Sequence, residues 1–331
     1  MYSSVLLVYR IVSVAKLCDQ KNMTGEPSRA LLDEVGLEHS AGFSVGGVSV
    51  RLAAARSSDA SLDPSLAPFS MDAAIPDIKI QIDRVSALVP TSAPELFDSG
   101  SLWRLYEDDA GFRFDFTAAI FGDSPYKRLL VDRRFRESTV QMSEESASSK
   151  GVWPLGYPLD ELLITHRLTQ ERAIELHGVG IAGPDSANNL FVGHSGAGKS
   201  TTARLWSSLH KVEILSDDRI IIREHPSDND STQIFMYGTP WHGEAAFALP
   251  QRAPLQRIFV LEHGHGNVLT PLTPSQMVAE LFARAFVPFH RHEYVESALS
   301  FLERVAQSVP CYRYSFEPDQ RAVDRILHFN G

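Results

Sequence analysis

The chain has only two cysteines and no long uninterrupted apolar run, and its acidic residues outnumber its basic ones. Cys18 and Cys311 are too few for a disulfide framework or a zinc site, so the sequence predicts a reducing, cytoplasmic setting. No stretch reaches the ~18 uncharged apolar residues that a membrane helix needs, which predicts no membrane partner. A net charge of −10 argues against a nucleic-acid partner, because such a surface needs a basic field.

The first residues also lack a targeting signal. Residues 1–17 are mildly apolar, but Arg10 and Lys16 interrupt them and no basic segment precedes them. A second methionine, Met23, opens a polar segment. We therefore expect residues 1–40 to be an N-terminal extension, in part disordered, whose first 22 residues are dispensable.

What the chain does contain is a glycine-rich stretch that fits the phosphate-binding template G-x-x-x-x-G-K-[ST]. Its glycines let successive backbone N–H groups point inward around a nucleotide's phosphates. The lysine adds charge for the outer phosphates, and the last serine offers a hydroxyl to Mg²⁺. The predicted nucleotide-binding residues are Gly193, His194, Ser195, Gly196, Ala197, Gly198, Lys199, Ser200 and Thr201.

The flanks of this stretch argue against the alternative, a chance glycine-rich turn. The apolar residues 190–192 enter it as a buried strand would, and residues 200–210 leave it with apolar side chains spaced for one helix face. A strand, a glycine loop and a helix N-terminus are the parts that hold a polyphosphate.

Short β-like segments dominate the first half of the chain. Gly46-Gly47 predicts a hairpin or a kinked strand, and residues 78–82 alternate as a half-buried strand does. Residues 57–72 have the composition of a surface loop, and residues 143–151 that of a linker. We therefore predict a smaller, mostly β and mostly antiparallel N-terminal domain over residues 41–150, without a catalytic constellation.

The second half alternates strands and helices, which predicts an α/β domain over residues 151–331 with a mixed sheet. Thr273-Pro274-Ser275-Gln276 has capping-box spacing and should start a helix that runs to about residue 285. The predicted strands cover residues 173–181, 190–192, 212–215, 219–223, 233–237, 257–261 and 312–316, and the other predicted helices cover 158–168, 200–210, 294–305 and 319–328.

Two adjacent carboxylates end one of these strands. Asp217-Asp218 starts 18 positions after Lys199. Phosphoryl transfer needs a carboxylate for the metal and another that accepts the acceptor's proton. The alternative, an ordinary turn or helix cap, is also typical of aspartates in this position.

This spacing resembles the superfamily of HPr kinase/phosphorylase and ATP-dependent phosphoenolpyruvate carboxykinase, in which a P-loop helix is closely followed by a strand ending in paired aspartates. His177-Gly178-Val179 before the P-loop is similar to the His-Gly-Val stretch of HPr kinases. The order Tyr-Gly-Thr-Pro-Trp-His-Gly-Glu over residues 237–244 looks like that of HPr-kinase-related proteins of ribosomal-peptide maturation, including lasso-peptide precursor kinases. Residues 250–254 depart from the family's phosphorylase-associated turn.

The resemblance implies an HPr kinase-like P-loop fold over residues 151–331 and roles for specific residues. Asp217 is expected to be the catalytic base, with His177 and Lys199 as further catalytic residues. Ser200, Asp218 and Glu244 are the expected metal ligands, and ATP and Mg²⁺ the expected cofactors.

The function expected from the sequence is therefore Mg²⁺·ATP-dependent transfer of a γ-phosphoryl group to a serine hydroxyl of a peptide or protein, with a lasso precursor peptide as the leading substrate. Two alternatives stay open: a kinase for a small molecule such as free serine, and a nucleotide-binding module that transfers no phosphate. Homo-oligomer formation also stays open.

We predict that Lys199→Ala abolishes turnover and weakens ATP binding while leaving the fold intact, because the lysine is expected to contact the outer phosphates. Titration calorimetry with ATP, beside a melting curve, checks both parts. An unchanged ATP affinity would remove Lys199 from the site.

Overall fold

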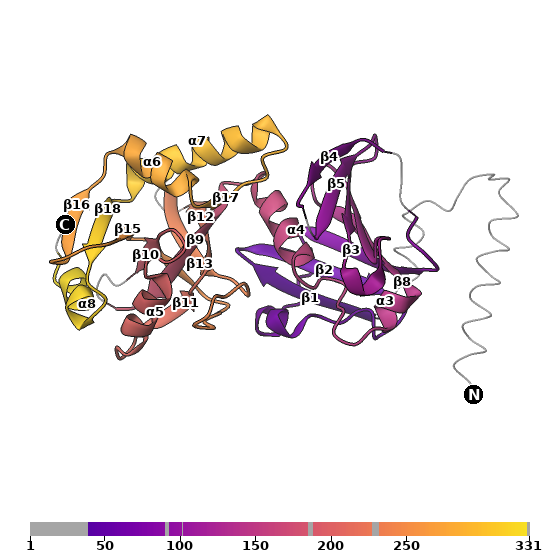
Figure 1. The fold of residues 1–331 in the computed structure, drawn as a ribbon, viewed down its shortest axis with the longest axis horizontal. Helices are drawn as coiled ribbons and strands as arrows, with labels where there is room; N and C mark the ends of the chain where they lie inside the picture. Colours follow the sequence, from indigo (N-terminus) through magenta and orange to yellow (C-terminus); the bar gives the residue numbers. More distant parts are fainter. Residues whose placement is uncertain (1–38, 90–92, 101, 185–187, 227–231, 330–331) are drawn as a thin grey trace, which may run out of the picture. The chain divides into compact units, whose positions relative to one another are not determined.

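The computed structural model describes residues 39–89, 93–100, 102–184, 188–226 and 232–329. The expected N-terminal extension, residues 1–40, lies outside the described residues except for His39 and Ser40, which already belong to a strand. In the described part of the chain, no helix is long and apolar enough to cross a membrane. The described residues form two sheets with helices against them (Figure 1).

The first sheet has eight strands in the order β1-β2-β3-β8-β7-β6-β5-β4. The pairs β2–β3 and β3–β8 are parallel and the others antiparallel, so the sheet is mixed but mostly antiparallel, as predicted. Its strands are β1 (His39–Val45), β2 (Val48–Ala54), β3 (Ile78–Val85), β4 (Glu95–Asp98), β5 (Trp103–Glu107), β6 (Phe112–Phe116), β7 (Lys127–Val131) and β8 (Glu137–Ser143).

Two segments of this half are more ordered than the sequence indicated. The predicted surface loop at 57–72 contains the 3-10 helix η1 (Pro64–Phe69), which buries Leu66 and Phe69 in the core of the sheet. The predicted linker at 143–151 contains α3 (Glu144–Ser148), whose first turn is capped by the Ser143 hydroxyl. Polar composition misled both predictions, because a few apolar side chains or one N-cap suffice to order a short segment.

The second sheet has the order β14-β13-β12-β9-β10-β15-β18-β16, and β11 and β17 also pair with β9. Strands β10, β15 and β18 are parallel, and the other pairs are antiparallel, so this sheet is mixed as well. Its strands are β9 (Ala173–Ala182), β10 (Asn189–Val192), β11 (Glu213–Ser216), β12 (Arg219–Pro226), β13 (Thr232–Gly238), β14 (Arg252–Pro254), β15 (Arg257–His263), β16 (Val268–Pro271), β17 (Ala285–Phe286) and β18 (Cys311–Phe316).

The helices of this half are close to their predicted positions. They are α4 (Leu159–Leu168), α5 (Lys199–Ser207), α6 (Pro274–Phe282), α7 (His292–Ser308) and α8 (Gln320–Leu327). The capping box of α6 is confirmed, with Thr273 and Gln276 bonded reciprocally. The helix ends at Phe282 rather than near 285, because Ala285 and Phe286 pair with β9 instead.

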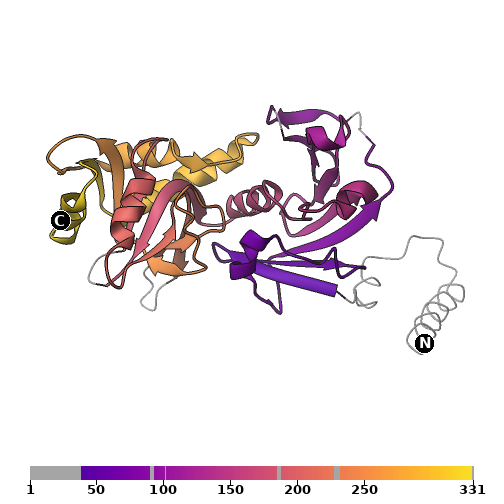
Figure 2. The same cartoon turned by 60° about the horizontal axis from the view of Figure 1, so that its bottom comes forward.

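Helix α4 belongs to the core of the first sheet, although it follows the domain boundary predicted near residue 150. Leu159, Leu163 and Ile164 are buried in that core, together with Ile221 and Trp241 from the second half. Figures 1 and 2 both show α4 between the two sheets. The predicted boundary itself stays a prediction.

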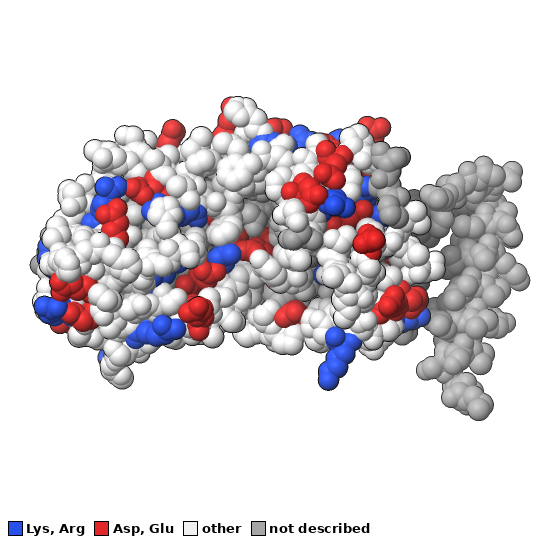
Figure 3. Space-filling view, in the orientation of Figure 1, with Lys and Arg blue, Asp and Glu red and all other residues white. Residues whose placement is uncertain are grey.

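The charges on the surface are mixed. On the face shown in Figure 3, Lys and Arg side chains are interspersed with Asp and Glu and form no continuous basic area. This pattern agrees with the net charge of −10.

A carboxylate is buried where α4 meets the loop between β13 and β14. Asp160 is 2% exposed and accepts a hydrogen bond of 2.7 Å from Trp241 Nε1. Burial raises the pKa of Asp160 to about 6, against the lowering effects of the Trp241 hydrogen bond and the Lys127 charge. Trp241 precedes His242 and Glu244, so this contact ties α4 to the loop between β13 and β14.

We predict that Asp160→Asn removes a pH-dependent loss of stability. A carboxyl whose pKa is higher in the folded state binds more protons folded than unfolded, so its contribution to stability falls as the pH rises from about 4 to about 6. The wild type should therefore lose up to about 3 kcal/mol relative to the variant across that interval. Urea unfolding of both proteins at several pH values measures this difference. Parallel pH profiles would contradict the prediction.

Candidate active site

The predicted strand, glycine loop and helix are confirmed around residues 193–200. All four residues of β10 are buried, and α5 begins directly after the loop, at Lys199. Gly198 caps the helix with a φ of 97°, and a Cβ there would come within 2.5 Å of the Phe316 ring. Only glycine is compatible with both the backbone angle and the space at this position.

The lysine of the loop is folded back onto it. Lys199 is 7% exposed, and its Nζ donates to the carbonyl oxygens of Gly193 and His194 at 3.0 and 2.9 Å. Burial lowers the pKa of Lys199, and the nearby charge of Asp218 opposes this effect. An anion in the loop would offer the ammonium group a stronger acceptor than these carbonyls.

His263 is a P-loop neighbour whose position the sequence did not reveal. It ends β15, the strand parallel to β10, and its Nε2 lies 2.6 Å from the Gly196 carbonyl oxygen. Its ring stacks on Phe316 with centroids 6.3 Å apart. The only sequence signal would have been its place at the end of a parallel strand, where α/β sheets bind ligands.

The two adjacent aspartates face different partners. Asp217 is 2% exposed, and its carboxylate accepts hydrogen bonds from three backbone N–H groups, those of Gly243, Ala245 and Phe247, at 3.0, 2.8 and 3.2 Å. These bonds hold the loop between β13 and β14. Asp217 was expected to be the base, but its oxygens are occupied by this structural contact.

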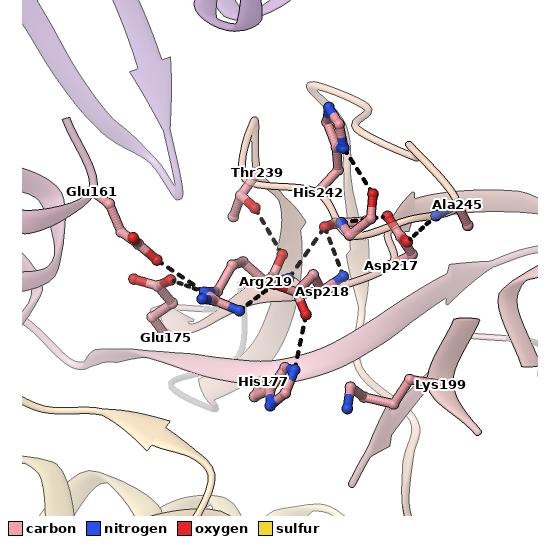
Figure 4. Close-up of polar contacts among 12 residues, drawn as sticks. Glu161, Glu175, His177, Lys199, Asp217, Asp218, Arg219, Thr239, His242 and Ala245 are labelled. Atoms are coloured by element: carbon pink, nitrogen blue, oxygen red, sulfur yellow. Dashed lines mark hydrogen bonds and ion pairs between the residues drawn. The ribbon is translucent and has the colours of Figure 1, made fainter. Parts of the chain in front are cut away.

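Asp218 instead faces His177 (Figure 4). His177 Nε2 lies 2.8 Å from Asp218 Oδ1, and the other carboxylate oxygen is paired with Arg219. Burial alone would raise the pKa of Asp218, but the His177 hydrogen bond and the Arg219, His177 and Lys199 charges outweigh it and lower the pKa below its ordinary value. Asp218 is therefore ionised at neutral pH.

Lys199 of the glycine loop lies on the side of Asp218 where His177 is found (Figure 4). Figure 4 shows the amino group of Lys199 pointing toward the His177 ring. The mutual effects of Lys199 and Asp218 on each other's pKa agree with this proximity. The structure thus brings together Lys199, His177 and Asp218, and it places Asp217 beside them in a supporting position.

Behind Asp218 is a layer of buried charges that the sequence did not single out. Arg219 Nε lies 2.9 Å from Glu161 Oε1 and 3.5 Å from Glu175 Oε1, and its guanidinium lies 4.1 Å from the centroid of the Phe286 ring. Burial raises the pKa of the fully buried Glu175 well above its ordinary range, with the Glu161 charge adding to the effect. Glu175 is two residues before His177 on β9, so strand alternation would have placed the two on one face.

The three expected metal ligands come from different elements of the chain. Glu244 is exposed, in the loop that Asp217 holds, whereas Ser200 lies in the first turn of α5. Within the described ranges, no group of three or more His, Cys, Asp or Glu side chains could hold a metal ion. The hydroxyl of Ser200 and the carboxylate of Asp218 are nevertheless oxygen donors of the kind that Mg²⁺ prefers when phosphates and water complete its shell.

Comparison with known proteins adds no assignment. A scan against protein-family models and a search of curated proteins found no match to this chain.

We predict that Asp217→Ala destabilises the protein, because three partly buried N–H groups lose their acceptor and each unsatisfied buried group costs up to about 1–3 kcal/mol. The loop at residues 243–247 should also become a preferred site of proteolysis. Urea unfolding and limited proteolysis with mass mapping measure these effects. Asp218→Asn serves as the matched control, with a smaller loss of stability. Equal stability of Asp217→Ala and the wild type would contradict the anchoring role.

Proposed function

We propose that the protein is a Mg²⁺·ATP-dependent kinase that transfers a γ-phosphoryl group to a serine hydroxyl of a peptide or protein. The observation that carries the proposal is the combination of a P-loop lysine with the ionised Asp218–His177 pair on the same side of the site. The charge on the transferring group needs neutralisation and the acceptor needs orientation, and these residues are suited to supply both.

We assign the base to Asp218 rather than to Asp217. The acceptor hydroxyl would donate its proton to Asp218, whose side chain is 26% exposed although its oxygens are paired with His177 and Arg219. Asp217 is 2% exposed, and its oxygens already accept three backbone hydrogen bonds. A kinase base that is ionised at neutral pH can receive the proton late in a loose transition state. His177 would orient that carboxylate toward the acceptor.

The remaining residues hold this arrangement in place. Arg219 fixes one oxygen of Asp218 and is itself fixed by Glu161 and Glu175, so Asp218 has little rotational freedom. The P-loop amides and Lys199 would bind the phosphates of ATP. The Ser200 hydroxyl would hold Mg²⁺, which neutralises phosphate charge when bound.

The test is incubation with labelled ATP and serine-containing acceptors, with mass spectrometry to locate the phosphate. We predict that Asp218→Asn lowers the transfer rate by about 10² to 10⁴ while ATP affinity stays within a few-fold, because a base acts only in the transition state. His177→Ala should lower the rate in the same direction.

Asp324→Asn, an exposed change on α8, is the control and should keep the wild-type rate. If Asp218→Asn keeps most of the wild-type rate on a verified acceptor, the base assignment is wrong. If ATP binds and no acceptor is phosphorylated, the non-catalytic nucleotide-binding module becomes the better description.

A further inference from the structure

A surface hollow lies apart from residues 193–200. It is a groove of about 460 Å³, bordered by the turn of the β1–β2 hairpin, residues 68–71, the end of β13 and residues 250–252 at the start of β14. We call it the Arg252 groove. Its volume is in the range of natural ligand sites.

The walls of the groove are held together by specific contacts. The Arg223 guanidinium donates to the Gly46 carbonyl oxygen at 2.9 Å, which ties the hairpin turn to β12. Gly46 has a φ of 60°, and a Cβ there would come within 2.6 Å of Ile221. The turn therefore packs against the second sheet at a distance that only glycine allows, and the groove is formed before any ligand arrives.

The described residues that line the groove carry a net positive charge, whereas the chain as a whole carries a net negative charge. The lining contains one basic residue, Arg252, and no Asp or Glu, although acidic residues outnumber basic ones by 41 to 31 in the chain. Arg252 Nη1 donates to the Tyr237 hydroxyl at 3.1 Å, and its guanidinium lies 5.0 Å from the Phe235 ring centroid.

Arg252 is also unlike the arginines around it. Over the residues that the structure describes, no carboxylate forms an ion pair with Arg252, whereas Arg219 and Arg223 are each paired with glutamates. A guanidinium held by aromatic rings, with donors left over, is suited to a carboxylate. The charge of the groove therefore favours an acidic ligand.

Strand register relates the groove to the candidate active site. Ile221, Tyr237 and Arg252 are direct partners across β12, β13 and β14, and Arg219 lies opposite His177 two residues earlier on β12. Residues two apart on a strand share a face, so Arg252 and His177 are on the same face of the sheet. Two strand spacings across and two residues along give about 12 Å between Arg219 and Arg252.

We propose that the Arg252 groove binds an acidic side chain of the peptide substrate, at least about four residues from the acceptor serine. Four residues is the shortest extended chain that covers about 12 Å at about 3.3 Å per residue. The inference rests on the proposed kinase function, because that function makes a peptide the ligand. It adds that an acidic side chain of this peptide is recognised.

Binding is measured first, without nucleotide, so that the groove is tested even if no phosphoryl transfer occurs. The probes are fluorescent peptides with one serine and glutamates about four to six residues to either side, beside counterparts with glutamine. We expect the acidic peptides to bind about tenfold more tightly, and Arg252→Gln to reduce that ratio to about one. Arg134→Gln, an exposed arginine on the first sheet's β7–β8 connection, is the matched control and should keep the ratio.

A second variant guards against an uninformative loss of folding. Gln251→Glu adds a carboxylate to a lining that has none, and it should reverse the preference in favour of the glutamine peptides. With a working acceptor, the same ratios should appear in KM, with smaller changes in kcat.

Three results would overturn the inference. The first is equal binding of acidic and neutral peptides by the wild type, and the second is a preference that survives Arg252→Gln. The third is saturation by free glutamate at the affinity of the peptides, which would make the groove a small-anion site. Absence of phosphoryl transfer, by contrast, would refute the proposed function and leave the binding ratio to decide about the groove.

Discussion

The carboxylate of Asp217 accepts three backbone hydrogen bonds from the loop between β13 and β14, and this contact gives two adjacent aspartates different surroundings. Loops of this kind carry backbone groups that need partners once they are buried. One short carboxylate satisfies three of them here. Because the chain turns after β11, the next carboxylate, that of Asp218, contacts His177 and Arg219 instead.

Asp218 is in turn fixed by charges that are expensive to bury. Arg219 lies between Asp218 on one side and Glu161 and Glu175 on the other, and Phe286 covers its guanidinium. Such networks contribute little net stability, because desolvation offsets the attraction between the charges. Their effect is geometric: each partner restricts the orientation of the next.

One loop borders both regions to which we assign a function. It leaves β13 at Gly238, which lines the Arg252 groove, and it returns at Pro250, which lines the same groove. Between these ends, Gly243 and Ala245 are held by Asp217, and Trp241 is held by Asp160 of α4. A ligand in the groove would therefore contact both ends of the segment whose middle lies beside Asp218. The first sheet contributes the other wall of the groove.

The sequence by itself determined the local elements. The template from Gly193 to Ser200, the apolar strand before it and the helix after it were all readable, because phosphate binding imposes glycines and a lysine at fixed spacing. The capping box at Thr273 and most strands of both sheets were readable for the same reason: hydrogen-bonding needs and side-chain alternation act over a few residues. Short ordered segments such as η1 and α3 were missed, because their order comes from burial against distant strands.

Only the tertiary structure decided which polar groups meet. The sequence placed Asp217 and Asp218 next to each other, but the roles expected from it are the reverse of those that their contacts support. The turn after β11 determines which groups each carboxylate contacts. Nothing in the sequence indicated that Arg219 would lie between Glu161 and Glu175, or that Arg252, in a groove lined by the β1–β2 hairpin, would form no ion pair with a carboxylate of the described residues. These relations depend on strand register and on packing between residues far apart in the chain, 58 positions for Arg219 and Glu161 and 177 for Arg223 and Gly46, and no local pattern encodes them.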